Sequence, residues 1–136
     1  APVKGGCYVI DRPRAALTAL CEGLATGLAI YQAVRHARVV VAFDAGNLVP
    51  VAHRLKPAGS VVICADNDHE TEGRIGINPG LKKAREAAEV IGCGVAHPEG
   101  IDGSDFADAL AEWERPHRAI ERVVMKAARY VEAQPP

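Results

Sequence analysis

Short apolar runs alternate with amphipathic stretches along the chain, and this pattern predicts the order of strands and helices. We expect strands at 3–10, 15–21, 38–43, 61–65 and 95–97, because these runs are short, apolar and bounded by turn residues. Helices are expected at 23–37, 48–55, 79–91, 106–114 and 118–132. Strands that are apolar throughout and alternate with helices predict an α/β fold, with a central, mostly parallel sheet flanked by helices.

Three segments carry more specific expectations. In 23–37 the large apolar residues recur at spacings of three and four, which predicts that they form the buried face: Leu24, Leu28, Tyr31 and Val34. Asn78 and Pro79 are suited to the N-cap and first turn of the helix at 79–91. Segment 66–76 is charged and contains glycines, so we expect a loop there, with 69–77 as the most mobile internal segment.

Length and composition limit the kind of protein. With 136 residues, 49% apolar and 24% charged, the chain has the size and composition of one globular domain. No window approaches the roughly 18 consecutive apolar residues of a membrane-spanning helix, so we expect no membrane partner. Sixteen Lys and Arg against seventeen Asp and Glu give a net charge of -1. Nucleic acid would therefore have to bind to a local surface rather than through an overall basic charge.

The cysteines and the small motifs exclude several classes of protein. Cys7, Cys21, Cys64 and Cys93 are widely spaced and form no metal-binding pairs, which favours reduced thiols and a cytoplasmic protein. The P-loop, the dinucleotide-binding glycine pattern and the Gly-x-Ser-x-Gly elbow are absent. Because the chain starts with Ala1 and has no leader-like segment, we expect a piece of a longer protein.

Acidic residues follow three of the predicted strands, at the end where ligands bind in parallel α/β sheets. Glu22 follows the run at 15–21, Asp44 follows 38–43, and Asp66 and Asp68 follow 61–65. In an extended segment the side chains of Asp66 and Asp68 point to one side, while Asn67 turns away. Clustered carboxylates repel one another, and a hard divalent cation such as Mg²⁺ relieves that repulsion. With Glu22, the set predicts a metal site that can hold phosphate oxygens.

Plain structural roles remain open for the same residues. An Asp-x-Asp after a strand commonly shapes a turn by capping its own backbone. The neighbouring polar residues either contact substrate or serve the fold and the solvated surface: Asp44, Asn47, His69, Lys82, Lys83 and Arg85.

Longer strings around these residues resemble the Toprim domain. The strings are CEGLATGLA at 21–29, VAFDAGNL at 41–48, ICADND at 63–68, NPG at 78–80 and GSDFAD at 103–108. They are most similar to the Toprim module of primases and primase-helicases carried by plasmids, phages and integrating conjugative elements. The resemblance covers about 15–112. We therefore expect 1–136 to be one Toprim domain, with the strand at 3–10 and the helix at 118–132 as its flanks.

The resemblance implies a compact, Rossmann-like fold and a set of site residues. In the family, the glutamate after the first core strand acts in acid/base chemistry or binds metal, and the Asp-x-Asp binds Mg²⁺. These roles fall on Glu22, Asp66 and Asp68, as catalytic and metal-binding residues. Asp105 and Asp108 match a further family segment, for which helix capping by Ser104 or Asp105 is the alternative.

The implied function is DNA primase activity in the replication of a plasmid, phage or mobile element. Such a nucleotidyltransferase makes RNA primers from nucleoside triphosphates on a single-stranded DNA template, with Mg²⁺ or Mn²⁺. Relatives of this type have a zinc-binding region before the Toprim module and often a helicase after it, so we expect such neighbours. Whether the isolated domain is active stays open, as do three alternatives: a Toprim nuclease, topoisomerase-type phosphodiester chemistry, and a non-catalytic module that binds nucleic acid or protein.

Overall fold

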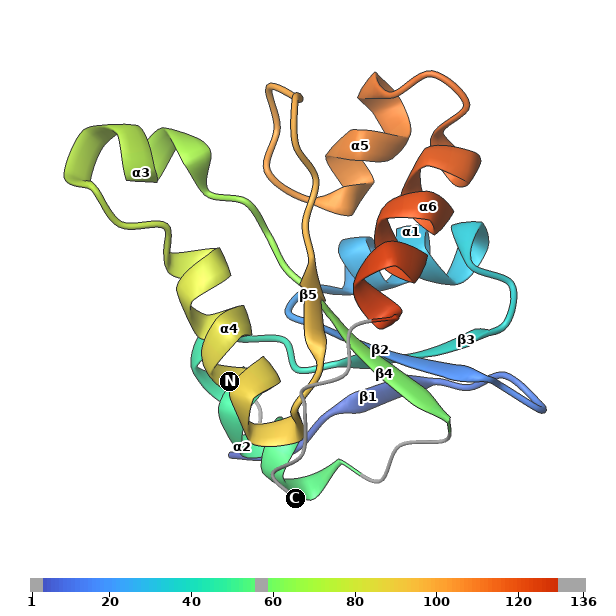
Figure 1. The fold of residues 1–136 in the computed structure, drawn as a ribbon. Coiled ribbons are helices and arrows are strands. Elements are labelled where there is room, and N and C mark those ends of the chain that lie inside the picture. The colour runs from blue at the N-terminus through green and yellow to red at the C-terminus, as the bar shows by residue number, and fades with distance from the viewer. Residues whose placement is uncertain (1–3, 56–58, 130–136) are drawn as a thin grey trace.

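A five-stranded sheet forms the centre of the fold in the computed structural model, which describes residues 4–55 and 59–129 (Figure 1). The strand order is β1-β3-β2-β4-β5. The parallel strands are β2 (Leu17–Cys21), β3 (Ala37–Val41), β4 (Ser60–Cys64) and β5 (Gly94–Ala96). The edge strand β1 (Tyr8–Ile10) runs antiparallel to β3. The predicted α/β fold with a mostly parallel sheet is thus confirmed.

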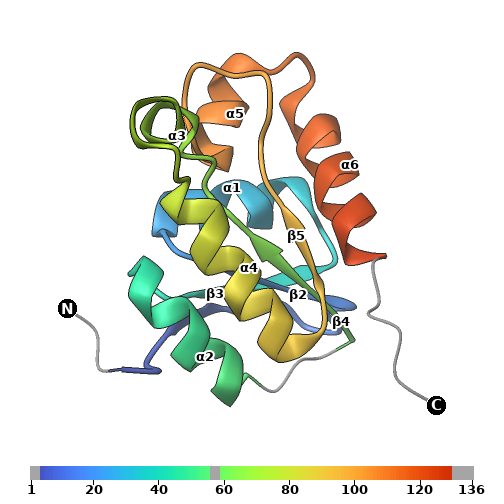
Figure 2. The same cartoon turned by 60° about the vertical axis from the view of Figure 1, so that its left-hand side comes forward.

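Helices cover both faces of the sheet (Figure 2). One face packs against α1 (Leu24–Ala33), α5 (Phe106–Glu112) and α6 (Pro116–Ala128), and the other against α2 (Leu48–Arg54) and α4 (Pro79–Ile91). Successive residues of β2 alternate between the two cores, with Ala19 and Cys21 on the α1 side and Leu20 on the α4 side. Because both faces are covered, the central strands are mostly apolar, with Thr18, Arg38 and Ser60 as the exceptions.

The three central strands end in register, and this register determines where the site lies. Cys21, the last residue of β2, pairs with Val41 on one side and with Cys64 on the other. The residues that follow these three positions therefore leave the sheet along one edge, which we call the carboxyl edge. Glu22 and Asp66 lie one and two residues beyond the strand ends.

The buried face of α1 matches the prediction only in part. Leu24 and Leu28 are 42% and 47% exposed, whereas Val34, the C-cap after the last helical residue Ala33, is fully buried and Tyr31 packs against the core. The side that faces the sheet consists of small residues and one isoleucine: Thr26, Gly27, Ala29, Ile30 and Ala33. A Cβ on Gly27 would lie 3.0 Å from Val41. The helix thus packs so closely on the sheet that only small side chains fit between them.

Segment 66–76, which we expected to be a loop, contains the short helix α3 (His69–Ile75), so that prediction is wrong. No residue of α3 is buried, and Figure 1 shows it standing away from the sheet. The helix ends on Gly76, whose left-handed backbone (φ 76°) lets its N–H bond to the carbonyl of Glu72. Local hydrogen bonds therefore maintain a helix that the apolar pattern could not indicate.

The first strand and the last helix form as predicted, but the structure shows them shorter than the predicted ranges. The strand predicted at 3–10 is formed only over Tyr8–Ile10, and residues 1–3 lie outside the described part. Helix α6 covers Pro116–Ala128, and residues 130–132 of the prediction lie outside it too. All four cysteines are free thiols, as predicted. In the part of the chain that the structure describes, no helix is long and apolar enough to cross a membrane.

Candidate functional site at the carboxyl edge

Acidic side chains that follow three strands, together with those at the start of α5, influence one another at the carboxyl edge. The pKa of Asp66 is raised to about 7, first by burial and then by the charges of Glu22, Asp105, Asp68 and Asp108. The pKa of Glu22 is also raised, first by burial and then by Asp68 and Asp44, while the N–H of Ala45 lowers it. The structure thus brings the three predicted site carboxylates, Glu22, Asp66 and Asp68, into one electrostatic field.

Among these carboxylates, Asp66 lies in an especially unfavourable environment for a negative charge. Its Oδ1 is buried and has no hydrogen-bond partner within the described residues. A buried carboxylate oxygen without a donor is costly, and that cost adds to the repulsion from the neighbouring carboxylates. A bound cation would remove both penalties.

The Asp-x-Asp segment is held by the first turn of α4. The Oδ2 of Asp68 accepts a hydrogen bond of 2.8 Å from the N–H of Gly80, while its Oδ1 has no partner in the part of the chain that is described. Asn67 points elsewhere, as predicted: its Nδ2 donates to the carbonyl of Pro98, and its Oδ1 accepts from Asn78. A Cβ on Gly80 would lie 2.5 Å from the carbonyl oxygen of Asp66, so only glycine fits there.

Of the two roles that the sequence left open for Asp68, the structure shows the turn-forming one, in which Oδ2 fixes the turn against α4. The second oxygen, Oδ1, is not engaged by the described residues.

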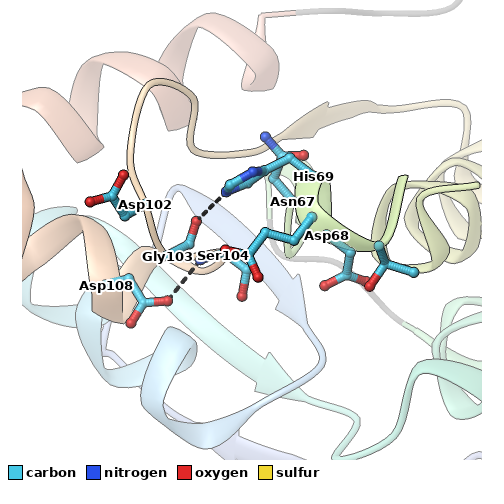
Figure 3. A pocket seen from close by; sticks show the side chains of 9 residues that line it. Asn67, Asp68, His69, Asp102, Gly103, Ser104 and Asp108 are labelled. Carbon is cyan, nitrogen blue, oxygen red and sulfur yellow. Dashed lines mark hydrogen bonds between the residues drawn. The ribbon is translucent and has the colours of Figure 1, made fainter. Parts of the chain in front are cut away.

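A hollow of about 260 Å³ lies beside the Asp-x-Asp, between the start of α3 and the loop before α5 (Figure 3). The Nε2–H of His69 donates to the carbonyl of Gly103 over 2.9 Å and joins the two sides. Asp108 accepts from the N–H of Ser104, and Asp105 and Asp108 form a reciprocal capping box at the start of α5. These N–H groups lower the pKa of Asp108, whereas burial raises that of Asp105.

The other candidate residues lie outside this cluster of carboxylates or serve the fold. Asp44 accepts from the N–H of Gly46 and shapes its own turn. Asn47 is buried, and its amide bonds to the N–H of Gly5 and to the carbonyls of Gly6 and Ala42. Asn47 therefore ties the segment before β1 to the end of β3.

The lysine candidates lie on α4. Lys82 is exposed, and Lys83 forms an ion pair of 3.3 Å with Glu86. Within the described residues, no hydrogen bond or ion pair joins Lys82, Lys83 or Arg85 to the acidic side chains of the carboxyl edge.

Two features of this edge had no counterpart in the sequence analysis. Phe43 has a left-handed backbone (φ 69°), is 47% exposed, and donates its N–H to the carbonyl of Glu22 over 2.6 Å. Its ring lies 6.4 Å from that of Tyr8.

Gly80 is the second feature. The Asn-Pro-Gly string marks a helix start, but it does not reveal that the backbone of Asp66 lies against that glycine.

The donor set fits a hard divalent cation in an open site. Within the described residues, no three His, Cys, Asp or Glu side chains are arranged to hold a metal by themselves. Mg²⁺ commonly binds through one or two carboxylates and completes its shell with water and substrate oxygens. The unpartnered Oδ1 of Asp66 and the unengaged oxygen of Asp68 suit that arrangement.

The central part of the chain is similar to known proteins. The Toprim domain family matches residues 17–113. Two proteins of Escherichia coli, each named DNA primase TraC, are 40% and 39% identical to the chain over 97 residues. Each alignment covers 65% of this chain but only 9% and 7% of the relatives, so the chain spans less than a tenth of their length. No solved structure matches the chain significantly.

Proposed function

Because the chain belongs to the Toprim domain family and is of its primase type, we propose that it is the metal-dependent nucleotidyl-transfer domain of a DNA primase. It makes RNA primers on single-stranded DNA from nucleoside triphosphates, during replication of a plasmid, phage or other mobile element in the cytoplasm. Zinc-binding and helicase domains as neighbours belong to the same proposal. The observation that carries it is Asp66, with its unpartnered buried oxygen and raised pKa among several other carboxylates.

Each site residue has a distinct task in this proposal. Asp66 and Asp68 hold Mg²⁺ or Mn²⁺, and the hydrogen bond from Gly80 to Asp68 fixes the orientation of that carboxylate. Glu22, whose pKa is raised by burial and by the charges of Asp68 and Asp44, either completes the metal site or takes the proton of the attacking 3′-hydroxyl. The chemistry that the bound cation supplies is neutralisation and orientation of the triphosphate.

The hollow beside the Asp-x-Asp is the proposed place for the substrate. His69 holds its two walls together through Gly103. Asp105 and Asp108 fix the start of α5, which forms one side of the hollow, through their capping box. These residues therefore act by shaping the space for the nucleotide.

Asp68→Asn tests the proposal in the longer protein that we expect to carry this chain. Asn keeps the volume of the side chain and its ability to accept from Gly80, but it removes the charge that a metal requires. Primer synthesis should fall by on the order of 10²-fold or more, because charge stabilisation is lost. The midpoint of thermal unfolding without metal should stay the same or rise slightly, since carboxylate repulsion decreases.

A control variant separates loss of charge at the metal site from loss of charge elsewhere on the domain. Glu89→Gln removes an exposed carboxylate near the far end of α4, away from Gly80, and it should retain wild-type synthesis. Wild-type synthesis by a stable Asp68→Asn variant would contradict the metal site and favour a binding module. Metal-dependent cleavage of the DNA strand without primer synthesis would favour the nuclease.

A further inference from the structure

One side of α6 carries basic residues that belong to no part of the carboxyl-edge site. The four are exposed, and their spacings of four, four and three residues place them on one side of the helix: Arg118, Arg122, Lys126 and Arg129. They line a shallow hollow of about 470 Å³ together with Glu121 and Met125. Helix α6 follows residue 113, where the match to the family ends. We call these four residues the α6 basic face.

The charges of the α6 basic face are not neutralised within the domain. In the described part of the chain, none of the four side chains forms a hydrogen bond or an ion pair. Glu121 is the one carboxylate that shares their hollow, so three positive charges remain in excess. The whole chain has a net charge of -1. Four of the sixteen Lys and Arg residues of the chain thus lie together on this face, while acidic side chains gather at the carboxyl edge.

The apolar side of α6 packs into the core and so holds the α6 basic face toward the outside of the domain. Ile120 and Val124 are fully buried in the core that α6 shares with α1 and α5. A basic amphipathic helix that binds a lipid surface needs its apolar side free to enter the membrane. Figure 2 shows α6 on the outside of the domain. Since its apolar side is already packed, only the charged side is available to a partner.

We propose that the α6 basic face binds the phosphate backbone of a single-stranded nucleic acid. Residues four apart on a helix are about 6 Å apart along its axis, which is comparable to the separation of neighbouring phosphates on a strand. The carboxyl edge repels phosphates, so a strand that approaches the site needs a basic surface outside it. Helix α6 begins four residues after α5 ends and packs against it, so the start of the α6 basic face lies near the helix that borders the site.

The proposal uses the proposed function only to identify the strand as the template. Binding to the α6 basic face requires neither metal nor catalysis. A failure of the Asp68→Asn test would therefore leave it untouched, and its own failure would leave the metal site untouched.

The test measures binding of a fluorescein-labelled oligothymidylate to the 136-residue chain by fluorescence anisotropy in EDTA, from about 50 to about 500 mM salt. In the double variant Arg122→Gln/Lys126→Gln, the Kd should rise about 10-fold or more near 0.1 M salt. The slope of log K against log salt should decrease in magnitude by about 1.4, which is about 0.7 for each lost phosphate contact.

Two further variants control for general charge effects. Arg14→Gln/Arg35→Gln removes the same charge from exposed residues at the opposite ends of the strands, and it should leave both the Kd and the slope unchanged. Glu121→Gln removes the carboxylate within the hollow and should tighten binding. Equal weakening by the two double variants, or none by either, would overturn the proposal. So would binding to anionic vesicles through Arg122 and Lys126 without binding to the oligonucleotide.

Discussion

Replacement of Asp66 by Asn should make the metal-free domain more stable at alkaline pH. The carboxylate is partly buried, its Oδ1 has no hydrogen-bond partner within the described residues, and neighbouring carboxylates repel it. Asn has nearly the same volume and carries no charge. The substitution therefore removes an unfavourable interaction from the folded state without opening a cavity.

The size of the effect follows from the pKa of this one group. Folding raises the pKa of Asp66 from 3.8 to about 7, with burial as the largest cause. At about 1.4 kcal/mol per pKa unit, the full penalty would be about 4 kcal/mol. The carboxylate is partly exposed and solvent screens its interactions, so we expect a gain of about 1–2 kcal/mol in the free energy of unfolding at pH 8. For a domain of this size that corresponds to a rise in Tm of about 3–8 °C.

The pH dependence has a defined sign. Because the pKa of Asp66 is higher in the folded state, the folded chain keeps this proton up to about pH 7, whereas the unfolded chain loses it near pH 4. The wild type should therefore lose stability as the pH rises from about 4 to about 7, and the penalty should then stay constant. The difference between Asp66→Asn and wild type should be near zero at pH 4 and largest above pH 7.

Thermal unfolding in EDTA, measured by circular dichroism across this pH range, checks the prediction. Glu114→Gln, which removes a carboxylate from an exposed position, should leave the Tm unchanged at every pH. Added Mg²⁺ should raise the Tm of the wild type more than that of Asp66→Asn, because a cation that binds the folded state stabilises it. A stability difference that does not change with pH, or a loss of stability at pH 8, would refute the reasoning.

Three further substitutions test the framework of the site by thermal or denaturant unfolding. Gly80→Ala should destabilise the domain by about 2 kcal/mol and weaken metal binding, because its Cβ would lie 2.5 Å from the carbonyl oxygen of Asp66; unchanged stability would contradict this close approach. Asn47→Ala should cost about 2–3 kcal/mol, since the hydrogen bonds from the N–H of Gly5 and to the carbonyls of Gly6 and Ala42 are lost; a cost below about 0.5 kcal/mol would show that they contribute little. Phe43→Gly should be more stable than Phe43→Ala by about 1 kcal/mol, because the backbone at position 43 is left-handed; the reverse order would contradict that conformation.

The sequence predicted the placement of the site better than the details of packing around it. Strands that alternate with helices along the chain run parallel, so their carboxyl ends meet at one edge of the sheet. The residues after Cys21 and Cys64 therefore lie on that edge. The caps at Asn78 and Asp105 were visible because their chemistry is local. Features that depend on a few neighbouring residues can be inferred from one sequence.

Features that depend on distant contacts could not be inferred. Of the large apolar residues at helical spacing in α1, Leu24 and Leu28 are exposed, because the closeness of the sheet selects Gly27 and Ala29 for the buried side. Val34, at the end of the helix, is buried as predicted. Helix α3 contributes nothing to the core, so the apolar pattern does not show it. The left-handed backbone of Phe43 forms where its N–H meets the carbonyl of Glu22, a contact between two strand ends that neither segment shows alone.

The most direct test of the metal site is an NMR titration of the ¹⁵N-labelled chain with Mn²⁺, a paramagnetic stand-in for Mg²⁺. Binding should be weak, because water and substrate would supply most of the ligands. Amide signals of Glu22, Asp66 and Asp68 and of their sequence neighbours should broaden first and together. The variants Glu22→Gln, Asp66→Asn and Asp68→Asn should each reduce that broadening. Broadening that begins at His36, His53 or along α6, and leaves the carboxyl edge unchanged, would contradict the site.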